Sequence, residues 1–126
     1  MGCRGLIIVY QVSEDGHKQV YAILYTHCDG HPGDIGLAVA RFLQCETDNG
    51  IFDHGIGTLA AKLVWFLQVY QPTISISLEP HEITASYVYN LVSENDTISM
   101  TISTPSGEFT GKSVDEAIRY CREYTE

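Results

Sequence analysis

The spacing of the apolar residues changes near the middle of this 126-residue chain, and the change limits the folds that the chain can adopt. From Gly57 to Tyr70 apolar side chains, Trp65 among them, recur at the period of a helix with a wide apolar face. Pro72 ends this helix, and apolar and polar residues then alternate. The alternation predicts three half-buried strands in a meander. Their inward residues are Ile74, Ile76 and Leu78, then Tyr87, Tyr89 and Leu91, and then Ile98, Met100 and Ile102.

The residues before Gly57 predict a hairpin followed by a short helix. Two β-rich runs, residues 6–10 and 20–25, flank a turn signal, so we expect an antiparallel hairpin with both strands largely buried. A helix is expected over residues 35–44 with Asp34 as its N-cap, and residues 46–55 read as a polar loop.

The C-terminal residues predict one more helix. Ser113 and Glu116 form a capping box, which opens a helix that runs to about Tyr124. The predicted order is β-β-α-α-β-β-β-α, with strands and helices in separate runs. This order favours an α+β fold, an antiparallel sheet packed by about three helices, in a single domain over residues 1–126.

The charge of the chain excludes some partners. The chain has sixteen acidic and seven basic residues, for a net charge of -9, and the bases form no cluster. Direct nucleic-acid binding needs a basic face and is therefore disfavoured. No apolar run has membrane-spanning length, and the four cysteines form no C-x-x-C pair, so we expect reduced thiols and a cytoplasmic location. A basic protein partner fits the charge, and a homo-oligomer is compatible with the sequence.

The segment around Asp29-Gly30-His31-Pro32 is the first candidate site. In an extended segment His27, Asp29 and His31 would point the same way, and two imidazoles with a carboxylate can bind zinc or a similar ion. The same residues are also turn formers: Asp29 can bond backbone amides, and Pro32 sets the direction in which a helix begins. We favour the turn interpretation and expect no cofactor.

Two further residues would allow the candidate site to be the active site of a small enzyme. Asp53 and His54 could add ligands or a base if their loop folds near Asp29, which would suit a hydrolase or a metal-dependent enzyme. Cys28 lies beside His27, but the neighbouring carboxylates would raise the pKa of its thiol and disfavour a nucleophile.

Several short motifs carry a family resemblance. They are Arg4-Gly-Leu, then Cys28-Asp-Gly-His-Pro32 with Gly36 and Phe42-Leu43, then Gly55-Ile-Gly-Thr-Leu-Ala-Ala-Lys-Leu-Val64, and Tyr87-Val-Tyr89. The chain resembles a family of uncharacterised bacterial, phage and large-virus proteins that has no known activity. That family usually has Trp at position 28 and Tyr at position 31, so the resemblance implies that Asp29 and Gly30 shape the backbone or form one wall of a pocket.

These observations favour a binding function over a catalytic one. We expect a small acidic interaction protein, in the manner of a phage or mobile-element accessory factor that docks on a host protein. A small-molecule binding or sequestering protein is the other non-catalytic alternative. The residues expected to bind are Asp29, Gly30, His31, Pro32, Gly36, Asp53 and His54.

Overall fold

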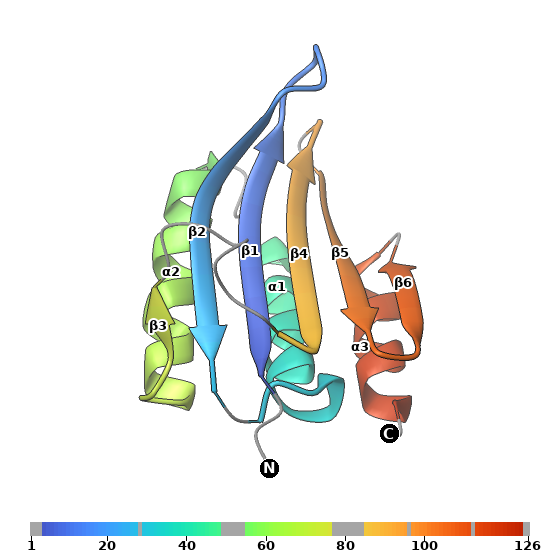
Figure 1. Cartoon of the computed structure of the whole chain (residues 1–126). Helices are drawn as coiled ribbons and strands as arrows, with labels where there is room; N and C mark the ends of the chain where they lie inside the picture. Colours follow the sequence, from blue (N-terminus) through green and yellow to red (C-terminus); the bar gives the residue numbers. More distant parts are fainter. Residues whose placement is uncertain are drawn as a thin grey trace.

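The computed structural model describes residues 4–27, 29–48, 55–76, 85–95, 97–111 and 113–124. Within these residues one six-stranded mixed sheet carries three helices on one face (Figure 1), which confirms the α+β class. The strands are β1 (Gly5–Val12), β2 (Lys18–Thr26), β3 (Ser75–Ile76), β4 (Tyr87–Glu94), β5 (Thr97–Thr104) and β6 (Gly107–Gly111). The helical segments are the π-helical turn η1 (Pro32–Gly36), α1 (Leu37–Asp48), α2 (Gly55–Tyr70) and α3 (Val114–Glu123).

The neighbours of the strands differ from those of a meander. The order across the sheet is β3-β2-β1-β4-β5-β6, and β1 pairs with β4 in parallel, whereas the other pairs are antiparallel. The described part of the run from Ile74 forms β3, which lies on the outer side of β2, with Ile76 opposite Leu24. The expected three-stranded meander is therefore wrong at its first strand. Alternation decides which face a side chain joins, but it does not decide which strand lies alongside.

One large core lies between the sheet and the helices. Leu59, Leu63 and Leu67 form the buried stripe of α2, four residues apart, and they belong to the same core cluster as Ile7 and Tyr89 of the sheet. Burial of each such leucine contributes about 1.5–3 kcal/mol of transfer free energy. The wide apolar face of this helix suggests a central position, but that expectation is wrong: α2 lies behind β2 and β3 at one edge of the sheet, and α1 lies between α2 and α3 (Figure 1).

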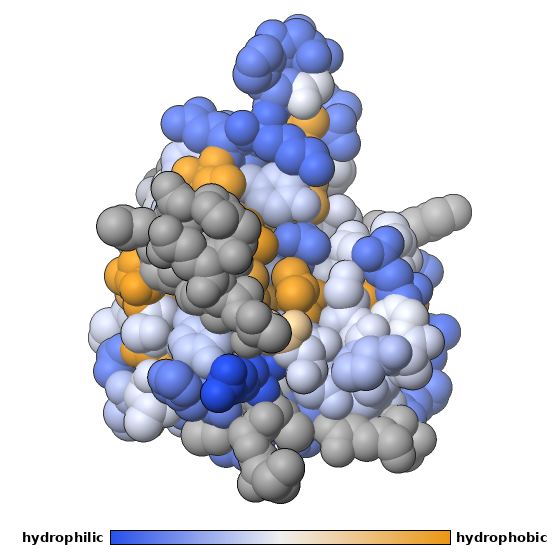
Figure 2. All heavy atoms as spheres, viewed as in Figure 1, coloured by the Kyte–Doolittle hydropathy of each residue, from blue (hydrophilic) through white to orange (hydrophobic). Residues whose placement is uncertain are grey.

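The opposite face of the sheet has a small apolar cluster of its own. It consists of Leu6, Ile23 and Tyr25, with Ile8 and Val88 packed against them. Figure 2 shows apolar side chains in the middle of this face and a hydrophilic hairpin tip projecting beyond it.

The hairpin between β1 and β2 is less buried than the sequence suggested. The second half of β2 is buried, but Val20 and Tyr21 in its first half are 49% and 39% exposed. The reason is that the hairpin extends past the rest of the sheet (Figure 1), and the described part of β3 pairs only with Leu24 and Tyr25 on the outer side of β2. The expectation that both strands are largely buried is therefore wrong for the outer half.

A helix boundary and a strand differ from those expected. Helix α1 continues to Asp48, so residues 46–48, expected in a loop, belong to the helix. Glu46 accounts for part of this extension, because its carboxylate lies 3.4 Å from the Lys62 ammonium of α2. The short strand β6 was not predicted. The capping box is confirmed: the Ser113 hydroxyl oxygen accepts a hydrogen bond from the Glu116 amide at 3.3 Å. No helix in the described residues is both long and apolar enough to cross a membrane.

Candidate functional site

The turn after β2 is built by backbone geometry. Asp29 adopts a left-handed conformation with φ of 58°, which reverses the chain, and its carbonyl accepts a hydrogen bond from the Ile35 amide at 3.2 Å. Pro32 then begins η1, and the His31 carbonyl accepts from the Asp34 amide at 3.0 Å. Asp34 was expected to be the N-cap of the helix, but it lies inside η1, and the N-cap position belongs to His31 without a side-chain bond.

The inner side of the turn packs against the sheet and α3. The buried Tyr89 hydroxyl donates a hydrogen bond to the Gly30 carbonyl at 2.6 Å. A Cβ atom on Gly36 would lie only 2.8 Å from the Tyr89 ring and 3.2 Å from the Cys121 sulfur, so this contact requires glycine. Gly30, Pro32 and Gly36, which we expected to bind, are thus buried and shape the turn from inside.

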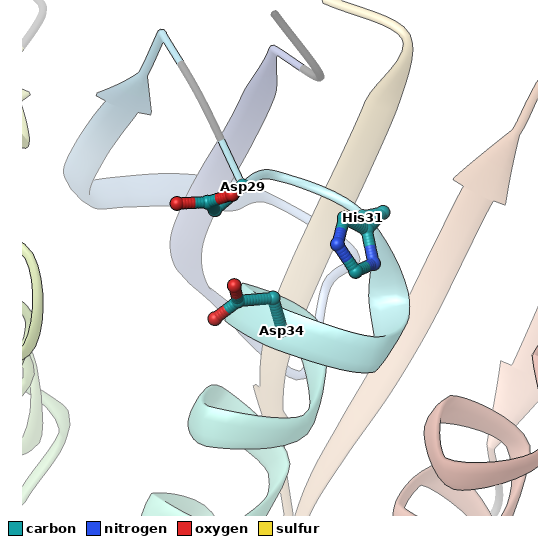
Figure 3. A group of neighbouring side chains, drawn as sticks. All are labelled: Asp29, His31 and Asp34. Carbon is teal, nitrogen blue, oxygen red and sulfur yellow. The ribbon is translucent and has the colours of Figure 1, made fainter.

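The outer side of the turn carries a cluster of possible metal ligands. One ligand atom from each of Asp29, His31 and Asp34 lies within 4.8 Å of the others (Figure 3). His27 was expected in this group and is not part of it among the described residues: it is exposed, with its Nδ1 3.4 Å from the Tyr25 hydroxyl. The reversal at Asp29 ends the alternation that would have aligned His27 with His31, and the π turn brings Asp34 in its place.

The end of α2 closes over this cluster. The Tyr70 hydroxyl donates to Asp34 Oδ1, and Gln71 Nε2 donates to Asp29 Oδ2 at 3.3 Å. Desolvation and the bond to the Asp34 carboxylate raise the pKa of Tyr70 to about 12, so the hydroxyl remains a donor at neutral pH. The cluster therefore joins the turn to a helix that starts far along the chain. Asp53, His54 and Cys28, the other predicted site residues, lie outside the described residues.

A groove lies between α1 and α2, which run antiparallel. Three contacts align the two helices: Lys62 with Glu46, the rings of Phe66 and Phe42 with centroids 5.2 Å apart, and Tyr70 with Asp34 inside η1, which leads directly into α1. The space between them has a volume of about 710 Å³. We call it the α1–α2 groove, and its lining residues are Ala38, Arg41, Phe42, Cys45, Glu46, Lys62, Trp65, Phe66 and Tyr70.

The groove combines aromatic surface with positive charge. Trp65 is 70% exposed and Tyr70 is 46% exposed, although both are large hydrophobic side chains. Arg41 and Lys62 contribute two of the seven basic residues of the chain. A site of about 300–1,000 Å³ with an apolar lining and a few polar groups is typical of ligand-binding pockets.

Sequence reasoning assigned Trp65 to the buried face of its helix and so missed the groove. The signal was present in the helical period. Trp65 is two residues from both Leu63 and Leu67, which is about 200° around a helix, so it projects away from their buried stripe. The helical period does not show which element lies beside Trp65. That element is α1, which forms the other wall of the groove.

No protein-family model matches the chain, and neither the curated proteins nor the solved structures include a significant match. The function is therefore inferred from the geometry of the turn and the groove.

Proposed function

We propose that this protein is a non-catalytic binding protein and that the α1–α2 groove is its binding surface. The observation that carries the proposal is the 70% exposure of Trp65 on the wall of an aromatic groove. Exposed aromatic surface of this kind costs free energy in water, and a bound partner removes the cost. Trp, Tyr and Arg, all three present here, are the residue types most enriched at the energetic centres of protein interfaces.

The groove suits a segment of another protein better than it suits a buried metabolite. Arg41, Cys45, Lys62 and Trp65 are all exposed, so the groove is open to solvent along its length. A partner can therefore enter from the side without a change in the fold. The sequence suggested that an acidic surface would dock on a basic protein, and the proposal here places the interaction in the groove instead. The phage or mobile-element context and the cytoplasmic location remain predictions.

An apolar anionic dye, 1-anilinonaphthalene-8-sulfonate, tests the groove directly. Trp65 is the only tryptophan of the chain, so energy transfer from it to the dye reports binding to the protein, and the Trp65 variant then tests whether the groove is the place. We expect saturable binding, and we expect Trp65→Ala, read by dye emission, to weaken it about tenfold. Val69→Ala is the matched control, because Val69 is 64% exposed on the same helix but does not line the groove. Equal losses in the two variants, or no binding by the wild type, would contradict the proposal.

The Asp29–His31–Asp34 cluster supports a second candidate, a divalent-cation site. Imidazole and carboxylate groups together suit Zn²⁺ or Mn²⁺, and each carboxylate that bonds to Tyr70 or Gln71 has a second oxygen for an ion. A bound cation would strengthen the link between the turn and α2. It would also reduce the mutual repulsion of Asp29 and Asp34.

Thermal unfolding of untagged protein with added Zn²⁺ or Mn²⁺ tests the cation site. We expect the melting temperature of the wild type to rise with metal, because an ion that binds only the folded state stabilises it. Asp34→Asn should abolish the response, while Asp48→Asn, an exposed acid at the end of α1, should keep it. The same response in both variants, or none in the wild type, would exclude the cluster as a metal site.

A further inference from the structure

We infer that the segment bound in the α1–α2 groove is an amphipathic helix whose apolar stripe is flanked by acidic side chains. The inference rests on the proposed function and adds the shape and charge of the partner.

The length of the groove indicates a helix of about two turns. On α1 the lining residues run from Ala38 to Glu46, and on α2 they run from Lys62 to Tyr70, so the first and last residues are eight steps apart on each helix. At about 1.5 Å per residue both walls are about 12 Å long. The anchors of an amphipathic helix at positions i, i+3 or i+4, and i+7 span about 10.5 Å, which matches this length.

The surface of the two walls is suited to such anchors. Phe42 and Phe66 meet at 5.2 Å between ring centroids, and Phe66 stacks on Tyr70 at 6.2 Å. These contacts make a continuous aromatic floor, and the exposed Trp65 also lines the groove. Leucine or isoleucine side chains of a partner would bury their apolar surface on this floor, as helices do in the hydrophobic grooves that recognise them.

The charge of the partner follows from the bases beside the floor. The chain as a whole has a charge of -9, yet the groove lining has two bases and one acid. That acid, Glu46, is already paired with Lys62 at 3.4 Å. Arg41 is exposed and forms no ion pair within the described residues, so it leaves a positive charge beside the aromatic floor. Acidic side chains on a partner would complement Arg41, whereas basic ones would be repelled.

A display library tests shape and charge together. The library consists of 14-residue helical peptides with leucine at the three anchor positions, and with Glu, Lys or Gln at random beside them. We expect selection on the wild-type protein to enrich Glu over Lys beside the anchors. Selection on Arg41→Glu should reverse the preference, and selection on Val69→Ala should preserve it. The best synthetic peptide should bind Arg41→Glu about fivefold more weakly, as expected for one exposed charge pair.

Each outcome has a defined meaning. Enrichment without a charge preference, or a preference that Arg41→Glu does not change, would overturn the inference. If the naphthalene dye binds but no peptide is enriched, the groove takes a small amphiphile; the inference then fails while the proposed function stands. If neither dye nor peptide binds the wild type, both fail. Circular dichroism of each variant confirms that a loss of binding does not reflect unfolding.

Discussion

Tyr89 illustrates how one residue holds the turn in place. Its side chain is fully buried, its hydroxyl donates to the Gly30 carbonyl at 2.6 Å, and its ring fills the space that the missing side chain of Gly36 leaves. Both halves of the side chain therefore contact the turn. The shape of the Asp29 turn depends on a strand that lies about sixty residues further along the chain.

Removal of the Tyr89 hydroxyl should destabilise the protein. In Tyr89→Phe the Gly30 carbonyl loses a buried donor, and we expect a cost of about 1–3 kcal/mol in the free energy of unfolding, measured with urea. Tyr21→Phe is the control, because Tyr21 is exposed and its hydroxyl lies 3.4 Å from Gln11. If the two variants are equally stable, the hydrogen bond to Gly30 makes no net contribution to the free energy of unfolding.

The same variant should change the response to alkali. Burial raises the pKa of Tyr89 above its usual value of 10. Above pH 10 the unfolded chain releases this proton and the folded chain retains it, so stability is fully present below pH 10 and falls as the pH rises further. Tyr89→Phe should therefore lose less stability than the wild type between pH 10 and 11.

At the residue scale the sequence predicted the backbone reversal at Asp29 better than the side-chain contacts around it. Asp-Gly and Pro specify a reversal because of their own backbone preferences, and these act locally. The cluster of possible metal ligands contains Asp34 and not His27 because of the π turn. The hydrogen bond from Tyr70 to Asp34 depends on the packing of α2. No local preference encodes either of these contacts.

At the scale of elements, local signals located helices well and strand partners poorly. The capping box at Ser113 and Glu116 and the leucine period of α2 both indicated the helices that are present. Strand β3 is only two residues long in the described part of the chain, and β6 carries one large apolar residue, Phe109. Segments this short have too few alternating positions for a strand, or the strand beside it, to be recognised from the sequence.

Helix α3 offers a direct test of its cap. Ser113→Ala removes the acceptor for the Glu116 amide and should cost about 1 kcal/mol in the free energy of unfolding. Ser113→Asn keeps a side-chain oxygen at the same position and should remain close to the wild type. Urea titration of both variants measures the difference. An asparagine variant as unstable as the alanine variant would mean that the serine acts through something other than the cap.

At the scale of the molecule, the parallel contact between β1 and β4 is the feature that no local pattern predicts. Parallel neighbours need a long crossover, and here the crossover contains β2, α1, α2 and β3. The arrangement places both helices on one face of the sheet (Figure 1), and their antiparallel alignment creates the groove. The candidate binding surface is thus a product of topology, which explains why the turn was visible in the sequence and the groove was not.

The charge of the whole molecule leads to a last prediction. If every one of the seven bases were paired with an acid, nine of the sixteen carboxylates would still have no basic partner. Their mutual repulsion opposes the compact state, and salt screens it. We therefore expect added NaCl to raise the melting temperature by about 2–4 °C between low and physiological ionic strength.

Two comparisons separate this effect from others. Replacing the exposed Glu14, Glu94 and Glu123 by glutamine should reduce the salt response, because it removes charge without touching the core. Binding of an acidic peptide at Arg41 should weaken in the same salt that stabilises the fold, since screening acts on attraction as well as on repulsion. A melting temperature that falls with NaCl would mean that favourable ion pairs outweigh the repulsion.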